Sequence, residues 1–305
     1  MNYDVIGDVH GQFEKLAALL RRLGYRETSV AWRHPDRTAI FVGDLIDRGP
    51  RQAATVELVR KMVDAGTAHC ILGNHEVNAI AWATPDPGNP GEYLRRHGRE
   101  DNRKQHAEFL AEVEGTPLHA ELISWFKTLP LWLDLGLIRV VHASWNDQYI
   151  GELTPFLGQD QTLTDDLIRW SNQKGHWAYA AVEALCKGLE VELPEGASFQ
   201  DNDGKVRTAM RIQWWNADLS TYRKSALVTP DSIERIPDIP MPADGRVKPY
   251  EGVPVFFGHY WRAGQPKLFA PNIACLDYSA GWDGWLVAYR WEGEPTLENE
   301  RFVWV

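Results

Sequence analysis

Cysteine is scarce in this chain of 305 residues. Its three cysteines, Cys70, Cys186 and Cys275, lie far apart, and no two of them form a CxxC pair. A disulfide framework or a zinc knuckle needs more cysteines at closer spacing. The sequence therefore favours neither, and we expect a reducing, cytoplasmic location.

Long apolar runs are also absent. The longest apolar stretch, residues 129–143, is interrupted by Asp134 and Arg139, whereas a transmembrane helix needs about 20 predominantly apolar residues. The N-terminus has no basic start followed by an apolar core, so we expect no targeting segment. These absences predict a soluble protein without a membrane partner.

The chain has fewer positively charged side chains than negatively charged ones. The chain has 32 Lys and Arg residues against 42 Asp and Glu residues, a net charge of −10. This balance argues against binding to the phosphate backbone of a long nucleic acid. Small phosphorylated substrates remain compatible with it, because bound divalent cations can invert the local charge of an acidic site.

The composition is that of a folded globular protein, with 44% apolar and 11% aromatic residues. Strand-like and helix-like segments alternate from the start of the chain, which is typical of an α/β protein. The expected early strands are 3–7, 38–42 and 68–72, and the expected early helices are 12–23 and 52–65. Each strand is followed at once by a polar cluster, GDVHG at 7–11, GDLIDRG at 43–49 and GNHE at 73–76. We expect these clusters to meet at one edge of the sheet, beyond the carboxyl ends of the strands.

The alternation changes in the second half of the chain. Further helices are expected at 103–113 and 118–128, and further strands at 131–135 and 137–142. From 146 to 250 the pattern weakens and turn-rich stretches appear, with one helix expected near 176–188. We interpret 146–250 as an insertion or cap within a single domain spanning 1–305. The closing strands are expected at 253–258, 272–277, 284–291 and 301–305, the last three forming an antiparallel finish.

Metal-ligand side chains follow these strands. Asp8 and His10, then Asp44, then Asn74 come after three successive strands, and His142 and His259 each end an apolar strand. Any one histidine alone would more simply be a core residue bonded to the backbone. Together they supply the carboxylate, amide and imidazole ligands that divalent metals bind, and Asp44 is the natural bridge between two cations.

The order GDVHG, GDLIDRG, GNHE, VHA and GH resembles the calcineurin-like metallophosphoesterases. Within that family it is similar to the branch of phosphoprotein phosphatases, bacteriophage-type phosphatases and bacterial symmetrical diadenosine tetraphosphatases. The resemblance is dense over 3–76, returns near 140–143 and 255–289, and is absent from 146–250. It implies a four-layer α/β/β/α sandwich of two mixed sheets that carries the inserted segment.

The resemblance also implies a dinuclear metal centre. It assigns Asp8, His10 and Asp44 to one metal, and Asp44, Asn74, His142 and His259 to the other. Manganese is the expected metal, with iron, nickel, cobalt or zinc as alternatives that these ligands also accept. A hydroxide held by the cations would attack phosphorus, so no protein nucleophile is required. The chain accordingly lacks GxSxG, a P-loop GxxxxGK and a reactive-cysteine signature.

Three further residues receive roles from the resemblance. His75 would be the general acid that protonates the leaving oxygen, and Asp47 would orient it. Arg48 would bind the phosphoryl group with two hydrogen bonds. The simpler interpretation of Asp47 and Arg48 is a surface ion pair. Glu76 and Gly49 are expected to be structural.

Details of the later motifs narrow the branch. His259 is followed by Tyr260 and Trp261 rather than by the second histidine of nuclease-like relatives, which favours a phosphatase or a polyphosphate hydrolase. Ser144 and Trp145 replace the small residues usual after the fourth motif and are expected to narrow the pocket.

The second half of the chain offers further substrate-binding candidates. Arg207 and Arg211 are candidates for a second phosphate-binding arginine, the alternative being solvated surface arginines. The tryptophans near the predicted site or in the insertion have two alternative roles, stacking on adenine or simple packing. These tryptophans are Trp145, Trp214, Trp215, Trp261 and Trp282.

Three functions follow from this pattern. The leading hypothesis is hydrolysis of phosphomonoesters, including those on phosphoproteins, by a dinuclear metal-dependent phosphatase. The second is hydrolysis of a dinucleoside polyphosphate such as diadenosine tetraphosphate at the same metals. The third is a non-catalytic metal-binding scaffold. A phosphorylated small molecule, a phosphoprotein or a dinucleoside polyphosphate is accordingly the expected partner.

Overall fold

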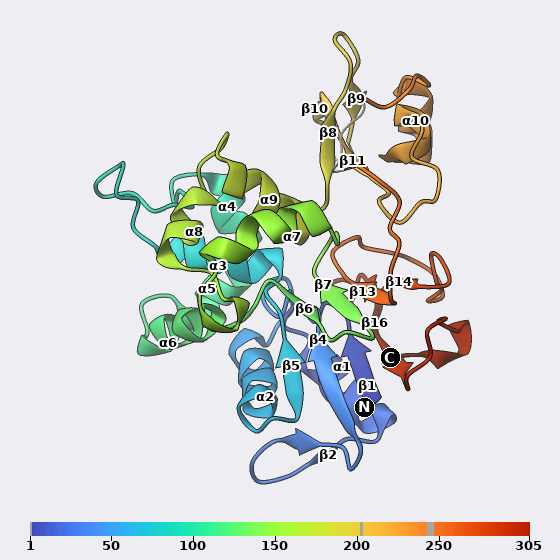
Figure 1. Ribbon diagram of the computed structural model, residues 1–305. Helices are drawn as coiled ribbons and strands as arrows, with labels where there is room; N and C mark the ends of the chain where they lie inside the picture. Colours follow the sequence, from blue (N-terminus) through green and yellow to red (C-terminus); the bar gives the residue numbers. More distant parts are fainter. Residues whose placement is uncertain (1, 202–203, 243–246) are drawn as a thin grey trace.

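Two mixed β-sheets form the centre of the molecule (Figure 1). The computed structural model describes residues 2–201, 204–242 and 247–305. The main sheet has the strand order β15-β16-β1-β4-β5, with β17 paired to β16. Its strands are β1 (Asn2–Ile6), β4 (Arg37–Phe41), β5 (Ala68–Cys70), β15 (Asp277–Tyr278), β16 (Trp285–Trp291) and β17 (Phe302–Trp304). Strands β1, β4 and β5 are parallel, whereas β16 runs antiparallel to β1.

The second sheet packs against the first through apolar side chains. Its strand order is β14-β13-β7-β6, in which only β6 is antiparallel to its neighbour. Its strands are β6 (Trp132–Asp134), β7 (Arg139–Val141), β13 (Val255–Phe257) and β14 (Ile273–Cys275). Val5 and Ile40 of the main sheet share one buried cluster with Val140 and Phe256 of the second. The predicted pair of mixed sheets is therefore confirmed.

Helices pack on the main sheet and gather beyond the ends of its strands (Figure 1). They are α1 (Phe13–Leu23), α2 (Gln52–Asp64), α3 (Asn74–Ala83), α4 (Glu100–Gln105), α5 (Ala107–Val113), α6 (Pro117–Phe126), α7 (Asp147–Leu153), α8 (Asp165–Trp170) and α9 (Trp177–Lys187). Helix α1 ends at Gly24, whose φ of +93° is the left-handed conformation that glycine adopts without steric cost. None of the helices in the described residues is long and apolar enough to cross a membrane.

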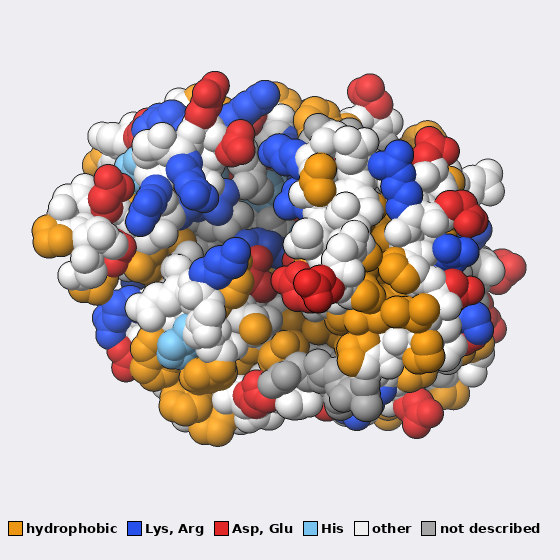
Figure 2. Space-filling model, turned by 90° about the horizontal axis from the view of Figure 1, so that it is seen from above, with side chains coloured by type: hydrophobic (Ala, Val, Ile, Leu, Met, Phe, Trp, Pro, Cys, Tyr) orange, Lys and Arg blue, Asp and Glu red, His pale blue; other side chains and the backbone are white. Residues whose placement is uncertain are grey.

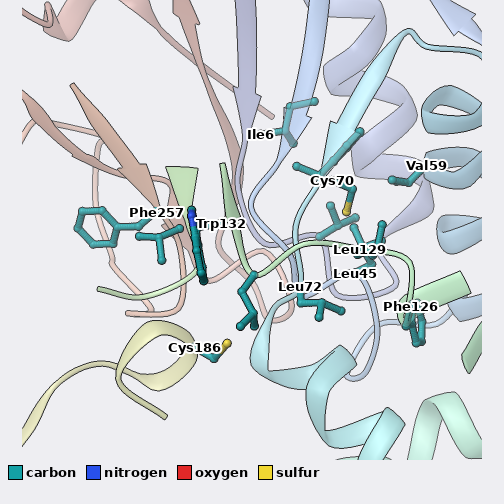
Figure 3. Close-up of a cluster of buried hydrophobic side chains, with 14 of the residues drawn as sticks. Ile6, Leu45, Val59, Cys70, Leu72, Phe126, Leu129, Trp132, Cys186 and Phe257 are labelled. Carbon is teal, nitrogen blue, oxygen red and sulfur yellow. The ribbon is translucent and has the colours of Figure 1, made fainter. Parts of the chain in front are cut away.

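The segment 146–250 divides into two parts. Helices α7, α8 and α9 belong to the main core: Cys186 of α9 lies in the same buried cluster as Leu72 and Trp132 (Figure 3). The part after Lys187 forms a small lobe that stands apart from the two sheets (Figure 1). Its elements are β8 (Glu190–Glu192), β9 (Phe199–Gln200), β10 (Val206–Arg207), β11 (Ala209–Ile212), α10 (Tyr222–Ser225), β12 (Ala226–Leu227) and the 3₁₀ turn η3 (Pro230–Arg235). The lobe has its own small core, which includes Phe199, Met210 and Ile236.

Five short elements complete the fold. They are the hairpin β2 (Arg26–Glu27) and β3 (Trp32–Arg33), and the 3₁₀ turns η1 (Thr154–Phe156) and η2 (Gln159–Gln161). A last 3₁₀ turn, η4 (Asn299–Arg301), precedes β17.

Two expectations about these elements were wrong. The strand expected at 272–277 does not join the antiparallel finish, because β14 pairs in parallel with β13 in the second sheet. Only β15, β16 and β17 form that finish. The helix expected at 103–113 is two helices that break at His106, whose side chain turns inward to a buried carboxylate. Both outcomes depend on long-range partners that local periodicity does not report.

Candidate metal centre and phosphate-binding site

The polar clusters that follow β1, β4 and β5 meet at one edge of the main sheet, as predicted. The backbone N–H groups of Val9 and His10 donate to the carbonyl of Asp44 at 3.0 and 2.9 Å. The N–H of His75 donates to Asp44 Oδ1 at 3.0 Å. Two segments distant in sequence are thereby hydrogen-bonded to one buried aspartate on a third.

Asp44 lies at the centre of a group of histidines. Its Oδ2 is 3.7 Å from His10 Nε2, 3.3 Å from His142 Nε2 and 3.8 Å from His75 Nε2. The described residues contain two sets of potential metal ligands, and within each set the ligand atoms lie within 4.8 Å of one another. Asp44 belongs to both sets. The sets are His10, Asp44 and His75, and Asp44, His142 and His259. This sharing is the arrangement that a bridging carboxylate requires.

Several atoms of the cluster have unmet bonding capacity. Asp8 Oδ1, His10 Nε2 and His259 Nε2 are buried and have no hydrogen-bond partner in the part of the chain that the structure describes. Asn74 Oδ1 lies 3.1 Å from His142 Nε2 and 2.8 Å from His259 Nδ1. Unpartnered buried polar atoms are costly unless a ligand satisfies them. The donor set of carboxylate, amide and imidazole therefore fits two divalent cations.

The backbone around the cluster is strained. Nine residues other than glycine have a positive φ in the described chain, and seven of them lie in the loops around this cluster. They are His10, Asp44, Asp47, Arg48, His259, Trp261 and Ser279. Such conformations cost on the order of 1–3 kcal/mol each and persist where the surrounding structure enforces them, commonly at functional sites.

Glu76 helps to hold this strained backbone in place. Its carboxylate accepts N–H groups of Asp44 and Leu45, both at 2.8 Å, and of Gly73 at 3.0 Å. Glu76 thus holds two of the ligand-bearing loops together, which is a structural role. Gly49 is also structural, because a Cβ at this position would lie 2.1 Å from the carbonyl oxygen of His10.

Asp47 links two histidines beside the metal-ligand cluster. His75 Nδ1 donates to Asp47 Oδ2 at 2.5 Å, and His106 Nδ1 donates to Asp47 Oδ1 at 2.7 Å. Burial opposes ionisation of this carboxyl, but hydrogen bonds from His106 and His75 lower the pKa of Asp47 to about 2. Burial likewise opposes a charge on His75, but the negative charges of Asp44 and Asp47 raise its pKa above the ordinary value. His75 is thereby oriented with Nε2 toward Asp44 and favours the protonated form.

His106 is a site residue that spacing between motifs does not reveal. A signal for it exists in the sequence, since His106, Phe109, Leu110 and Val113 share one helical face, and all four side chains are buried. A histidine in an apolar stripe needs a buried hydrogen-bond partner. The sequence does not identify that partner, which is Asp47, 59 residues away.

Arg48 lies beside the same cluster, next to two tryptophans. Its Cζ is 4.2 Å from the centroid of the Trp261 ring and 5.7 Å from that of Trp282. Arg48 Nη1 is buried without a hydrogen-bond partner among the described residues. Arg48 is therefore not part of a surface ion pair, and it keeps a donor available for an anion.

The other predicted substrate-binding residues lie in different parts of the structure. Arg211 on β11 forms an ion pair with Glu190, with 3.5 Å between Nε and Oε1. Burial and then the charge of Arg211 hold the pKa of His259 well below its ordinary value. Arg207 lies on the β9–β10 hairpin and donates to Asp201 there at 2.7 Å. Trp145 Nε1 donates to Asp147 Oδ1 at 2.9 Å. The structure thus places the charge of Arg211 near His259 while pairing it with Glu190, and it places Arg207 and Trp145 in other contacts.

The unusual fourth motif packs against α9. Ser144 Oγ donates to the carbonyl of Ala184 at 2.5 Å, and Trp214 Nε1 donates to the carbonyl of Ala143 at 3.0 Å. The Trp215 ring stacks on Phe257 at 5.6 Å between centroids. These side chains pack the base of the small lobe against the second sheet.

Lys and Arg side chains gather, among some Asp and Glu side chains, on the face of the molecule above the strand ends (Figure 2). Figure 2 shows a hollow near the centre of this face, with Lys and Arg side chains along its rim. This local concentration contrasts with the overall charge of −10. Such a rim attracts anionic substrates.

Comparison with known proteins identifies the fold and its chemistry. The sequence model described as calcineurin-like phosphoesterase matches residues 1–193, more than half of the chain. The chain belongs to the calcineurin-like phosphoesterase family. Family membership indicates a hydrolase and implies a dinuclear divalent metal centre, for which the cluster around Asp44 supplies candidate ligands.

Individual relatives match part of the chain. The asymmetrical bis(5'-nucleosyl)-tetraphosphatase PrpE of Oceanobacillus iheyensis is 33% identical over 155 residues, and that of Bacillus subtilis is 30% identical over 157 residues. The matches cover 50% of this chain and 60–62% of those enzymes, so the chain spans less than two thirds of their length.

Among solved structures, a mutant of a cold-active protein tyrosine phosphatase has a TM-score of 0.50 and 16% sequence identity. The match covers 97% of this chain and 79% of that one. This likeness supports the metallophosphoesterase fold.

Proposed function

We propose that this calcineurin-like phosphoesterase hydrolyses the polyphosphate chain of dinucleoside polyphosphates at a dinuclear metal centre, with manganese as the expected metal. The observation that carries the reaction type is the placement of His75. Its Nδ1 is occupied by Asp47, and its Nε2 faces Asp44 at the centre of the ligand cluster. A substrate phosphate bound at the metals would therefore lie within reach of a positioned proton donor.

Each residue near the cluster has a distinct task in this reaction. Asp8, His10 and Asp44 would hold one cation, and Asp44, Asn74, His142 and His259 the other. When bound, the cations supply a nucleophile from water at neutral pH and neutralise charge on the phosphoryl oxygens.

The chain's own side chains bind the phosphate and move the proton. Arg48 donates from its free Nη1 to the phosphoryl group, and Arg211 adds positive charge near His259. His75 gives the proton on Nε2 to the leaving oxygen, while Asp47 stabilises the charged imidazole.

The substrate class rests on the relatives. Enzymes 30–33% identical over half of this chain are named bis(5'-nucleosyl)-tetraphosphatases. The basic rim around the hollow suits a substrate with several phosphates. Dinucleoside polyphosphates thus come before phosphomonoesters, whereas the sequence alone favours phosphomonoesters.

Phosphomonoesters remain the second candidate because of the buried proton donor. An alkoxide is a strongly basic leaving group and needs protonation in the transition state, whereas a nucleotide leaves as a weakly basic phosphate. The pairing of His75 with Asp47 is thus a greater advantage for an ester than for an anhydride.

A substrate panel tests the proposal. Metal-stripped protein is reconstituted with Mn²⁺ and assayed on diadenosine tetraphosphate, p-nitrophenyl phosphate and a phosphoserine peptide. We expect the highest kcat/KM on diadenosine tetraphosphate, and loss of turnover in Asp44→Asn. A higher kcat/KM on either monoester would favour the second candidate. Absence of turnover on all three with two metals bound would favour a non-catalytic scaffold.

A further inference from the structure

Trp261 and Trp282 are unusually exposed for aromatic residues beside a buried centre. The two residues are 54% and 60% exposed, respectively. Both rings flank the guanidinium of Arg48, at 4.2 and 5.7 Å from its Cζ. Each tryptophan is therefore largely open to solvent next to a phosphate-binding candidate.

The loops that carry these tryptophans are tied to each other. The buried carboxylate of Asp277 accepts the N–H of Trp261 at 2.8 Å and that of Ser279 at 2.9 Å. Lys15 Nζ donates to the carbonyls of Ala280 at 3.1 Å and of Trp282 at 3.2 Å. Rings on loops held in this way lose little conformational freedom when a ligand stacks on them.

The Trp282 loop also lies directly against the centre. A Cβ added at Gly281 would be 2.9 Å from Arg48 Cδ and 3.0 Å from His10 Cβ. The loop is therefore closely packed on Arg48 and on a candidate metal ligand. Trp261, for its part, is two residues after the candidate ligand His259.

We propose that Trp261 and Trp282 form a stacking subsite for the purine base of a nucleotide whose phosphate binds Arg48. The subsite rests on the proposed function, and it names the group that the same site recognises beyond the phosphates. Indole rings stack on bases, and an arginine on one indole face adds a cation–π contact.

A nucleobase fits this position better than the ring of an aryl phosphate. In an aryl phosphate the ring is joined to phosphorus through a single oxygen, so it would lie inside the buried cluster. In a nucleotide the ribose separates base and phosphate, so the base reaches the exposed rim where the two indoles lie.

The test compares ATP with tripolyphosphate, which carries three phosphates but no base. Both are measured as competitive inhibitors, against whichever of p-nitrophenyl phosphate and diadenosine tetraphosphate the protein hydrolyses. In the double variant Trp261→Leu, Trp282→Leu we expect the Ki of ATP to rise about tenfold. The Ki of tripolyphosphate should rise less than about threefold, because the substitutions also remove the two rings that flank Arg48. Trp261→Phe, which keeps a ring, should retain most of the affinity for ATP.

Trp285 provides the matched control, because it is 47% exposed on β16 and is not among the rings stacked on Arg48. Trp285→Leu should change neither Ki. An equal rise for ATP and tripolyphosphate would overturn the subsite, since the tryptophans would then only support Arg48. A larger effect on the KM of phosphotyrosine than on the Ki of ATP would also overturn it, in favour of an aryl platform.

The inhibitor assay separates the subsite from the proposed function. If diadenosine tetraphosphate is not hydrolysed but the tryptophans still distinguish ATP from tripolyphosphate, the proposed substrate is wrong and the subsite stands. Thermal unfolding of each variant verifies that the fold is retained.

Discussion

His75, Asp47 and His106 form a buried hydrogen-bonded chain in which a single carboxylate serves two imidazoles. Each oxygen of Asp47 accepts one ring N–H, so the carboxylate cannot rotate without breaking a bond. That arrangement fixes which nitrogen of His75 faces Asp44. The orientation of the proton donor thus depends on residues that do not touch the substrate.

The charge of Asp47 should set the alkaline limit of activity. Burial lowers the pKa of His75 and the charges of Asp44 and Asp47 raise it. When Asp44 is bound to cations, Asp47 is the charge that keeps this pKa raised. A proton donor must be protonated, so kcat should be constant below that pKa and fall as pH rises through it. Asp47→Asn removes one of the charges that raise the pKa, so the fall should begin at lower pH. We also expect a loss of about 10²-fold at the plateau, within the range for general acid catalysis.

The kcat–pH profiles of the wild type and Asp47→Asn, measured with a phosphoserine peptide because its alkoxide leaving group needs the proton, check this prediction. An alkaline limb at the same pH in both proteins would show that His75 is not the group that titrates.

His106 should act as a positioning residue through Asp47. In His106→Asn one oxygen of Asp47 loses its donor, so Asp47 and His75 gain rotational freedom. We expect kcat to fall about tenfold for substrates with basic leaving groups, which need the proton most. For a phosphoanhydride the loss should be smaller, and metal content should be unchanged.

The matched control for His106 is His97→Asn. His97 stacks between Trp82 and Tyr93, at 3.8 and 4.1 Å between ring centroids, and its ring bonds to the carbonyl of Trp82. This variant should retain full kcat. Equal losses on esters and anhydrides in His106→Asn would instead indicate general damage to the fold.

At the scale of secondary-structure elements, the centre is built from the short loops that follow strands. Parallel strands β1, β4 and β5 deliver three of these loops to one edge, and β7 and β13 of the second sheet deliver His142 and His259. Close contact between the loops requires residues without side chains. Gly258, just after β13, is such a position, because an added Cβ would lie 1.8 Å from Asp8 Oδ1.

Gly258→Ala should therefore displace Asp8 and weaken the metal site to which that residue is assigned. We expect the Mn²⁺ content after dialysis to fall from about two ions per chain toward one, with a matching loss of activity. The control is Gly151→Ala in α7, where an added Cβ would meet nothing within 4 Å. Elemental analysis together with circular dichroism distinguishes metal loss from unfolding. Full metal content in Gly258→Ala would contradict the assignment of Asp8.

At the scale of the whole molecule, two buried clusters, one between the sheets and one that includes the helices through α9, form the large core, whereas the small lobe has a cluster of its own. The ligand-bearing loops belong to the large core, so metal binding should stabilise that unit as a whole. Chelation leaves the carboxylates and imidazoles of the centre without the cations that satisfy them.

Metal removal should accordingly lower both activity and stability. Stripped protein should be inactive and unfold at a lower Tm, and Mn²⁺ should restore both, since a ligand that binds only the native state stabilises it. Asp44→Asn should show neither recovery, because Asp44 belongs to both potential ligand sets. Differential scanning calorimetry with and without Mn²⁺ checks this. A normal Mn²⁺-dependent rise in Tm in the variant would argue against bridging by Asp44.

Much of this architecture could be predicted from sequence because its signals are local. The alternation of strands and helices, and the polar cluster after each early strand, predict the main sheet and the meeting of Asp8, Asp44 and Asn74 at its edge. That prediction succeeds because parallel strands must end at a common edge. The individual roles of these residues in binding metal and substrate stay predictions.

Other features depend on contacts between residues that are distant in sequence, and only the tertiary structure decided them. The placement of β14 in the second sheet, the pairing of His106 with Asp47, and the stacking of Trp261 and Trp282 on Arg48 are of this kind. Local periodicity reports which face of a segment is buried but not what lies against it. The identity of that neighbour is determined only when the whole chain packs.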